Sequence, residues 1–284
     1  MISVIQLGTL DYAEGLRLQQ QMIELRKNNQ IPDVLLLLEH KPVITLGRNA
    51  REENVLLSRK ELDRRGVELF ECDRGGDVTF HGPGQLVGYP IFDLRGYPNR
   101  SGTSTLKYLG AVDYVRRLEE LLIRTCLDFR IPAKRVPGLT GVWTDQQIEI
   151  RDNAAASAGS QDIHAEADPA SQEGKIAAIG VHISRSVTSH GFALNVNTDL
   201  DYFNLIIPCG IRAKPVTSMA KELRRNVPIE EVAQAVARNF GRVFDRQILW
   251  VETIDQLLGR TIGVPVKPPA EERTIRGEEE TYWA

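Results

Sequence analysis

Residues 74–85, with the sequence RGGDVTFHGPGQ, constrain the fold more than any other stretch of the chain. The segment places four glycines, a proline, an arginine and a histidine between two apolar segments, residues 67–70 and 86–92. Glycine lets a ligand touch the main chain and permits φ > 0, while Pro83 stiffens the turn. We predict a glycine-rich β-hairpin lying against a ligand. A plain hairpin that needs glycine only for its turns is the alternative.

Two nucleotide-binding motifs do not match this segment. Gly82, Gly84 and Gly88 give G-x-G-x-x-x-G, which is not the dinucleotide fingerprint, and no G-K-[ST] follows to complete a phosphate-binding loop.

Composition points to a single globular protein without nucleic acid or membrane partners. The 284 residues are 42% hydrophobic and 26% charged, with a net charge of -3 and no basic stripe interleaved with aromatics. The N-terminus has no basic leader region, and the longest apolar run, residues 34–38, is too short to span a bilayer. We therefore expect a soluble, cytoplasmic protein. A local basic cluster is either a solvated face or a dock for an acidic partner; it contains Arg212, Lys214, Lys221, Arg224 and Arg225.

Hydrophobic periodicity predicts an α+β fold, with helices packed on a mixed or antiparallel sheet. The expected helices span residues 12–27, 53–65 and 105–129 and a segment that starts at Pro228, the first of them with an Asp11–Glu14 capping box. The expected strands span residues 34–38, 43–46, 141–143, 175–183 and 192–197, with 148–150 as a possible hairpin partner and His190-Gly191 at a junction. Residues 151–173 indicate a flexible insertion, and the segment after Gly263 an extended tail.

Three cysteines, Cys72, Cys126 and Cys209, are too few and too scattered for a disulfide framework or a zinc site. Cys126 falls on the apolar face of an expected helix and Cys72 at a strand end, whereas Cys209 lies in a Pro-Cys-Gly corner. A free thiol titrates near pKa ~8.5, so a reactive Cys209 needs a neighbouring cation or base. Lys175, His81 and His190 are all candidates for that group, while His40 is expected to be structural and His164 lies inside the insertion.

Four segments in order resemble the motifs of the lipoyl(octanoyl) transferases. They are RGGDVTFHGPGQ at 74–85, GKIAAIG at 174–180, HGFALNVN at 190–197 and PCG at 208–210. The resemblance extends to about Phe244 and implies the fold shared with biotin and lipoate protein ligases. It also implies a catalytic domain at residues 1–250, including the insertion, and a C-terminal extension at 251–284.

The resemblance further implies the first step of endogenous lipoate biosynthesis. The Cys209 thiolate would take an octanoyl group from octanoyl-acyl carrier protein, and a lysine ε-amine would then receive it. That lysine belongs to lipoyl domains of 2-oxoacid dehydrogenase E2 subunits or to glycine cleavage H protein. Lys175 would favour the thiolate and relay protons. Because a thioester is already activated, the reaction would need neither ATP nor a metal.

The residues that match the family's substrate-binding segments are Arg74, Gly75, Gly76, Asp77, Val78, Thr79, Phe80, His81, Ala178, Ile179, Gly180, Gly191, Phe192 and Ala193. Main-chain N–H groups of residues 74–85 could also stabilise an oxyanion. The sequence departs from the family pattern at Ala178, where a serine is common, and in the length of its insertion and tail.

Two other functions compete with this one. An ATP-dependent lipoate or biotin protein ligase would share the fold but has no use for a nucleophilic Cys209. A non-catalytic acyl-carrier-binding module would need neither Cys209 nor Lys175.

Overall fold

The computed structural model describes residues 1–99, 107–145, 173–207, 215–259 and 281–283. Its centre is a large mixed sheet in the order β11-β1-β2-β6-β10-β9-β8-β7, with β12 paired to β9. The pairs β11–β1 and β1–β2 are parallel, and the other neighbours are antiparallel. The strands are β1 (Ile2–Leu10), β2 (Asp33–His40), β6 (Gln85–Ile91), β7 (Ala133–Val136), β8 (Leu139–Asp145), β9 (Glu173–Ser184), β10 (Val187–Asn195), β11 (Ile248–Trp250) and β12 (Thr281–Trp283).

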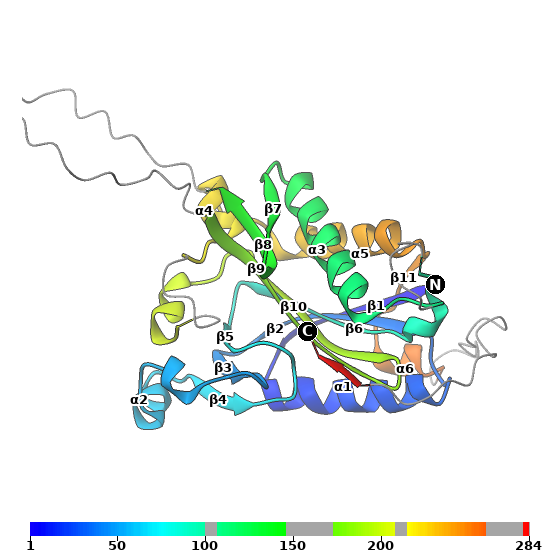
Figure 1. The fold of residues 1–284 in the computed structure, drawn as a ribbon, viewed down its shortest axis with the longest axis horizontal. Coiled ribbons are helices and arrows are strands. Elements are labelled where there is room, and N and C mark those ends of the chain that lie inside the picture. The colour runs from blue at the N-terminus through cyan, green and yellow to red at the C-terminus, as the bar shows by residue number, and fades with distance from the viewer. Residues whose placement is uncertain (100–106, 146–172, 208–214, 260–280, 284) are drawn as a thin grey trace, which may run out of the picture.

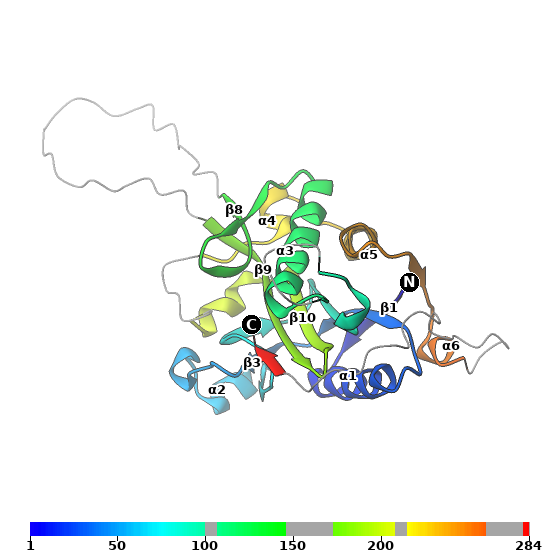
Figure 2. The same cartoon turned by 45° about the vertical axis from the view of Figure 1, so that its right-hand side comes forward.

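Helices cover both faces of the large sheet, as Figures 1 and 2 show. On one face, α3 (Ala111–Asp128) and α5 (Ile229–Phe244) enclose the main hydrophobic core. On the other face, α1 (Tyr12–Lys27) and α6 (Ile254–Leu257) enclose a second core. Strand β2 supplies Leu35 to the first core and Leu36 to the second, so the strand expected at residues 34–38 is confirmed and is buried on both faces.

A second, three-stranded sheet lies beside the α1 face (Figure 1). It has the order β4-β3-β5, with β4 (Glu68–Glu71), β3 (Val43–Leu46) and β5 (Val78–His81). Its own core includes Leu62 of α2 (Arg59–Arg64) and Leu205 of η3 (Leu200–Leu205). The remaining short helices are η1 (Glu52–Asn54), η2 (Leu94–Gly96) and α4 (Met219–Leu223). The small sheet therefore stands over the large one and can wall a site between them.

The expected glycine-rich hairpin is wrong, because β5 and β6 belong to different sheets. Strand β5 pairs with β3, whereas β6 pairs with β2 and β10. The turn between them is fixed at Gly84, whose N–H donates to Glu39 Oε2 at 2.6 Å and whose carbonyl accepts from the N–H of Asn197 at 2.8 Å. Residues 82–84 thus carry the chain from one sheet to the other.

The placement of His190 and Gly191 at a junction between strands is also wrong. Both residues lie inside β10 and pair with Val181 and Gly180 of β9. His190 has φ = 55°, a left-handed conformation that is uncommon for residues other than glycine. The irregularity is therefore a distortion within a strand, not a turn.

The helix predictions succeed where an apolar face is long. The bounds of α1 match those expected, and α5 begins directly after Pro228. The Asp11 capping box is wrong, because the Asp11 carboxylate binds Lys41 Nζ at 2.8 Å and does not cap the helix. The expected helix at 53–65 is divided into η1 and α2, and α3 begins at Ala111, later than expected.

Several predictions fall on residues outside the described ranges. These are the strand at 148–150, the insertion up to residue 172, the basic residues Arg212 and Lys214, the Pro-Cys-Gly corner with Cys209, and the tail from 263 to 280. Strand β12 at the end of that tail, and strands β1, β7 and β11, were not expected.

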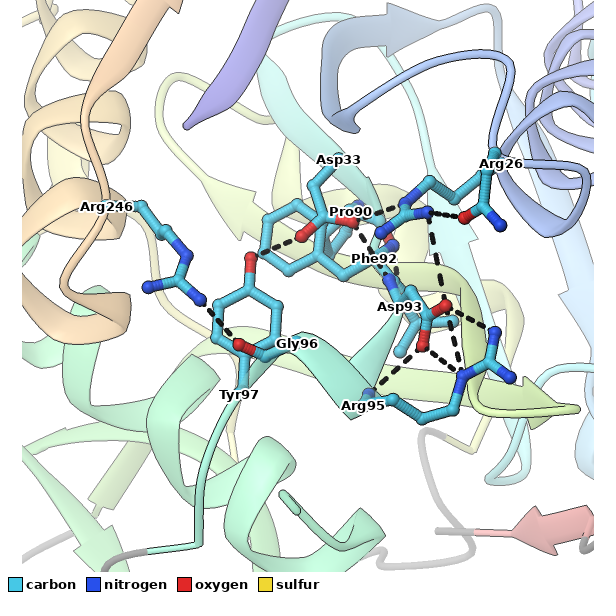
Figure 3. A network of polar contacts seen from close by, with 11 residues as sticks. Arg26, Asp33, Pro90, Phe92, Asp93, Arg95, Gly96, Tyr97 and Arg246 are labelled. Carbon is cyan, nitrogen blue, oxygen red and sulfur yellow. Dashed lines mark hydrogen bonds and ion pairs between the residues drawn. The ribbon is translucent and has the colours of Figure 1, made fainter. Parts of the chain in front are cut away.

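A buried polar network joins the start of β2 to the chain that follows β6, where these two neighbouring strands lie side by side (Figure 3). Asp33, at the start of β2, accepts hydrogen bonds from Arg26 Nε at 2.7 Å and from the N–H of Asp93 at 2.9 Å. Its other oxygen accepts from the Tyr97 hydroxyl at 2.5 Å. Arg26 is 1% exposed and Asp33 is 4% exposed. Loss of one partner of such a buried charge pair destabilises the folded state, because the remaining charge stays buried.

We predict that Asp33→Asn lowers the free energy of unfolding by about 3 kcal/mol, because the buried Arg26 guanidinium loses its nearer counter-charge and keeps only the Asp93 carboxylate, 4.0 Å from its Nη1. Urea unfolding at neutral pH measures the change. The matched control is Asp11→Asn, which removes the exposed Lys41 pair and should change stability little. Equal effects of the two substitutions would show that the Asp33 network does not carry this stability.

Candidate active site

A pocket opens on the α1 face of the large sheet, beneath the small sheet. It holds about 770 Å³ of space, part of it continuous with solvent. Its floor contains Val87, Ala193 and Ala178, which are register partners across β6, β10 and β9, with the Gly191–Gly180 pair one step further along β10 and β9. Because alanine and glycine project little from a sheet, the floor is hollow where larger strand residues would fill it.

Residues 73–77, which we call the Arg74 segment, cross directly over β9. The N–H of Gly75 donates to the carbonyl of Val181 at 3.0 Å. A Cβ on Gly180 would lie 2.7 Å from the Gly75 carbonyl oxygen, so only glycine permits this crossing. Two motifs that are about a hundred residues apart in the sequence thus form one wall of the pocket.

Arg74 brings a buried positive charge to the pocket. Its side chain is 7% exposed and donates from Nη2 to the Thr45 carbonyl at 2.7 Å, from Nε to Thr45 Oγ1 at 3.2 Å and from Nη1 to the Gly75 carbonyl at 3.0 Å. In the part of the chain that the structure describes, no carboxylate forms an ion pair with Arg74. The cation is therefore held by neutral oxygen atoms and is not neutralised by them, which favours negative charge in the pocket.

The Gln85 side chain fixes the tautomer of His81. The Gln85 amide nitrogen donates to the Phe80 carbonyl at 3.2 Å and to Asn195 Oδ1 at 2.8 Å, so its oxygen faces His81 Nδ1 at 2.7 Å. This arrangement assigns the proton to Nδ1 and leaves the lone pair on Nε2. Burial, together with the smaller electrostatic effects of His40 and Arg74, lowers the pKa of His81 to about 3.

His40 lies behind His81 and supports it. His40 Nε2 is 2.7 Å from the Tyr89 hydroxyl, and Nδ1 is 3.1 Å from the Leu10 carbonyl. Burial lowers the pKa of His40 to about 4. Tyr12 of α1 stacks on His81 with ring centroids 6.1 Å apart, so three rings are packed at this end of the pocket. The structural role expected for His40 agrees with these contacts.

His190 is held by a carboxylate outside the pocket. His190 Nε2 lies 2.7 Å from Asp73 Oδ1, and His182 Nδ1 lies 2.6 Å from the other oxygen. The two imidazole hydrogen bonds lower the pKa of the Asp73 carboxyl well below its usual range, while burial lowers the pKa of His190. Asp73 thus joins the Arg74 segment to both β9 and β10.

Lys175 lies at the other end of the pocket. It pairs with Trp143 of β8, and its Nζ is 5.2 Å from the centroid of the Trp143 ring. On the opposite side it forms a bridge to Val216. Lys175 and Val216 both line the pocket.

Cys209 lies outside the described residues, but the residues that flank it are fixed near the same pocket. Before it, the N–H of Ile207 donates to the Asn54 carbonyl at 2.8 Å, and the Asn54 side chain binds Asp77, which lines the pocket. After it, the Pro215 carbonyl accepts from the N–H of Lys175 at 2.9 Å.

The other two cysteines have structural positions, as expected. Cys126 is fully buried in the main core, and burial raises the pKa of its thiol to about 12. Cys72 follows β4 and donates to the Leu46 carbonyl at 3.4 Å.

Most of the predicted binding residues do line the pocket: Arg74, Gly76, Asp77, Val78, Thr79, His81, Ala178, Ile179, Gly180, Gly191, Phe192 and Ala193. Gly75 and Phe80 are not among the lining residues. Gly75 contacts β9 through its main chain, and Phe80 stacks on Tyr202 in the core of the small sheet. The carboxylate of Asp77 accepts from the N–H of Val78 and from Asn54 Nδ2, so it stabilises the segment.

Sequence reasoning missed several lining residues: Tyr12, Gln85, Val87, Tyr89, Asn195, Phe203 and Val216. Gln85 and Asn195 carried a usable signal, because a polar side chain within an apolar strand needs a hydrogen-bond partner or a ligand. Tyr12 and Phe203 had none, since their elements reach the pocket only through tertiary packing. None of the helices in the described ranges is long and apolar enough to cross a membrane.

The family model for the lipoyl protein ligase A/B catalytic domain matches residues 11–241. An octanoyltransferase of Koribacter versatilis is 51% identical over 279 residues, covering 98% of both chains. One of Acidobacterium capsulatum is 50% identical, covering 91% of this chain and 96% of its own. The chain belongs to the octanoyltransferase family. It is therefore an acyltransferase enzyme, as the four motifs predicted.

Solved structures confirm the predicted lipoate ligase-like fold. An archaeal bipartite lipoate protein ligase of Thermoplasma acidophilum aligns with a TM-score of 0.62 and 15% identity, covering 91% of this chain and 89% of its own. Lipoate-protein ligase A bound with ATP aligns with a TM-score of 0.60 and 16% identity, covering 92% and 93%. At this identity the likeness of the octanoyltransferase chain to the ligases concerns the fold alone.

The two buried histidines predict an acid-sensitive fold. His40 and His81 stay neutral when folded, but the unfolded chain binds protons at both below pH ~6.5. Stability is therefore complete above pH ~6.5 and falls as the pH drops towards 4, by up to about 1.4 kcal/mol per pH unit for each histidine.

Urea unfolding between pH 7 and pH 4.5 measures this slope, and His40→Gln should reduce it by the contribution of one group. His182→Gln is the matched control, because His182 is partly exposed and lies outside the pocket. An unchanged slope in His40→Gln would contradict a neutral, buried His40.

Proposed function

We propose that this acyltransferase moves an octanoyl group from octanoyl-acyl carrier protein to the lysine ε-amine of a lipoyl domain. The lipoyl domains would be those of 2-oxoacid dehydrogenase E2 subunits and glycine cleavage H protein. The proposal rests on the octanoyltransferase relatives and on the pocket. One observation carries it above the others: an apolar floor of small residues lies between two fixed cations, Arg74 and Lys175.

The pocket suits a fatty acyl chain attached to a polar carbonyl. Ala178, Ala193 and Val87 offer apolar contacts along the floor. At roughly 0.8 kcal/mol per buried CH₂, an eight-carbon chain could gain up to about 5 kcal/mol. Main-chain N–H groups of residues 74–85 would stabilise the oxyanion, which the positive charge of Arg74 also favours.

Cys209 would be the nucleophile and Lys175 its partner. The thiolate attacks the thioester carbonyl, the bond to the pantetheine sulfur breaks, and the departing sulfur takes a proton from the Lys175 ammonium. The neutral Lys175 amine then accepts a proton from the attacking lipoyl-domain lysine. An amide forms and the Cys209 thiolate is released. Lys175 ends the cycle as an ammonium again, and the proposed reaction uses neither ATP nor a metal.

The electrostatics favour Lys175 over the histidines as this partner. The low pKa of His81 and the lowered pKa of His190 mean that an imidazolium is disfavoured at both positions. A neutral imidazole does not stabilise a thiolate by charge, whereas an ammonium does. The histidines are better suited to hold the pocket wall.

Mixing the enzyme with octanoyl-acyl carrier protein and a lipoyl domain in the absence of ATP tests the reaction. We expect the lipoyl domain to gain one octanoyl group by intact mass, and the wild-type enzyme to carry octanoyl transiently when the acceptor is omitted. Cys209→Ala should show neither product. Transfer that begins only when ATP is added would instead identify a ligase, and an enzyme that binds the donor without being acylated would identify a binding module.

The assignment of Lys175 is tested by the pH dependence of Cys209 alkylation, followed by mass mapping of the Cys209 peptide. Lys175→Met should move the midpoint towards the ordinary thiol value of ~8.5 and slow alkylation at pH 7 about tenfold. Lys221→Met, which changes an exposed residue of α4, is the matched control and should behave as wild type. If His81→Ala abolished reactivity and Lys175→Met did not, a Cys–His pair would replace this assignment.

A further inference from the structure

Trp143 and Lys175 face each other across the β8–β9 pair. They are register partners, and a register shift between Val142 and Trp143 marks a local irregularity in the β8–β9 pairing at this point. Trp143 is 2% exposed, and the Lys175 Nζ lies over its ring at 5.2 Å from the centroid. An ammonium at this distance from an indole face is attracted by the ring quadrupole.

The main chain of Lys175 is held from both sides. Strand β8 pairs with it on one side. On the other, its N–H donates to the Pro215 carbonyl at 2.9 Å, and its carbonyl accepts from the N–H of Thr217 at 3.0 Å. Freedom is therefore left mainly to the four-carbon side chain, whose amine lies over the Trp143 ring.

Gly141 keeps space open around the same side chain. A Cβ at this position would lie 2.8 Å from Lys175 Cε, 3.5 Å from its Nζ and 2.7 Å from the Ala177 carbonyl oxygen. Gly141 also has φ = 122°, which other residues rarely adopt. The amine is thus seated between a glycine that makes room and a tryptophan that attracts it.

The charged groups around this seat have partners of their own. Among the described residues, Glu119 binds Arg116 and Arg135 and accepts from the N–H of Gly141. Glu222 accepts from Thr217 Oγ1 and Thr144 Oγ1, and Glu173 binds Lys134. Arg74, His81 and His190 face the pocket from its other walls. These groups are the same in the wild type and in a Trp143 variant, so they contribute equally to the ionisation of the thiol in both.

We propose that Trp143 is a positioning residue that holds the Lys175 ammonium over its ring and so favours the ion pair with the Cys209 thiolate. The inference rests on the proposed function, in which Lys175 is the partner of Cys209. An aromatic face shifts the equilibrium towards an ammonium held over the ring by a factor of roughly 2 at an exposed site to roughly 30 at a desolvated one. A tryptophan that served only to fill space would have no effect on thiol ionisation.

The test compares Trp143→Leu, Trp143→Phe and Trp250→Leu. Leucine keeps an apolar side chain but removes the ring face, and phenylalanine keeps a ring. Trp250 on β11 is 44% exposed at the far edge of the sheet and controls for a generic tryptophan loss. The measurements are the pH midpoint of Cys209 alkylation by iodoacetamide and the kcat and KM for octanoyl transfer.

We expect Trp143→Leu to raise the midpoint, to slow Cys209 alkylation at pH 7 about fivefold and to lower kcat by a similar factor with KM unchanged. Trp143→Phe should recover most of the wild-type rate, and Trp250→Leu all of it. If Trp143→Leu does not fold, the phenylalanine variant carries the test, because a wild-type fold with a midpoint as high as that of Lys175→Met overturns the ring-face role.

The two ideas fail differently. A wild-type midpoint in Trp143→Leu, together with a raised midpoint in Lys175→Met, overturns the role of Trp143 and leaves the proposed function intact. A wild-type midpoint in Lys175→Met itself overturns the Cys–Lys pair on which the inference depends.

Discussion

The close crossing of the Arg74 segment over β9 is the constraint on which the site depends. Main-chain atoms of Gly75 and Gly180 approach so closely that neither a side chain nor a shifted register is tolerated there. The crossing brings the small sheet down over the large one and turns an open face with a floor of alanine and glycine into a pocket. Asp73, through its two imidazole contacts, fixes the same segment from the outside. The pocket is therefore a product of tertiary packing, in which small residues on one sheet make room for a loop from the other.

The electrostatic character of the pocket follows from how its polar groups are satisfied. The Arg74 guanidinium donates hydrogen bonds to oxygen atoms of Thr45 and Gly75, which hold it in place. No carboxylate of the described residues forms an ion pair with it, so its charge is not neutralised. His81 is neutral because the desolvation of an imidazolium outweighs its single hydrogen bond to Gln85. The charged side chains that line this site are Arg74, Lys175 and the Asp77 carboxylate, which binds Asn54 and the N–H of Val78. In the proposed reaction the two cations would favour a thiolate or an oxyanion over a second, protonated base.

The sequence predicted local structure well and long-range pairing poorly. Helix α1 and strand β2 were predicted because their apolar patterns are long and regular, and the four motifs contain most of the residues that line the pocket. The hairpin at residues 74–85 was wrong because the hydrogen-bond partner of β5 is β3, about thirty-five residues earlier, and not the adjacent β6. Strand β1 was missed because Ser3 and Gln6 interrupt its apolar pattern, although the parallel pairing with β2 buries Ser3 completely. Tyr12 reaches the pocket only because α1 packs there, and no local pattern encodes that.

The likeness in fold to lipoate protein ligases has a physical basis that does not require a shared mechanism. Any enzyme that forms an amide between a fatty acyl group and a protein lysine must bury the chain, stabilise charge at the carbonyl and leave the carbonyl accessible to an amine. A sheet with a hollow floor and a loop of main-chain N–H groups above it meets all three needs, whichever leaving group activates the acyl chain. The chemistry is then decided by side chains at the mouth of the pocket. In this chain the lysine on β9 lies over the Trp143 ring, and its main chain is held on both sides. The fold therefore suits the burial of an acyl chain, and in the proposed reaction Cys209 and Lys175 decide how that chain is transferred.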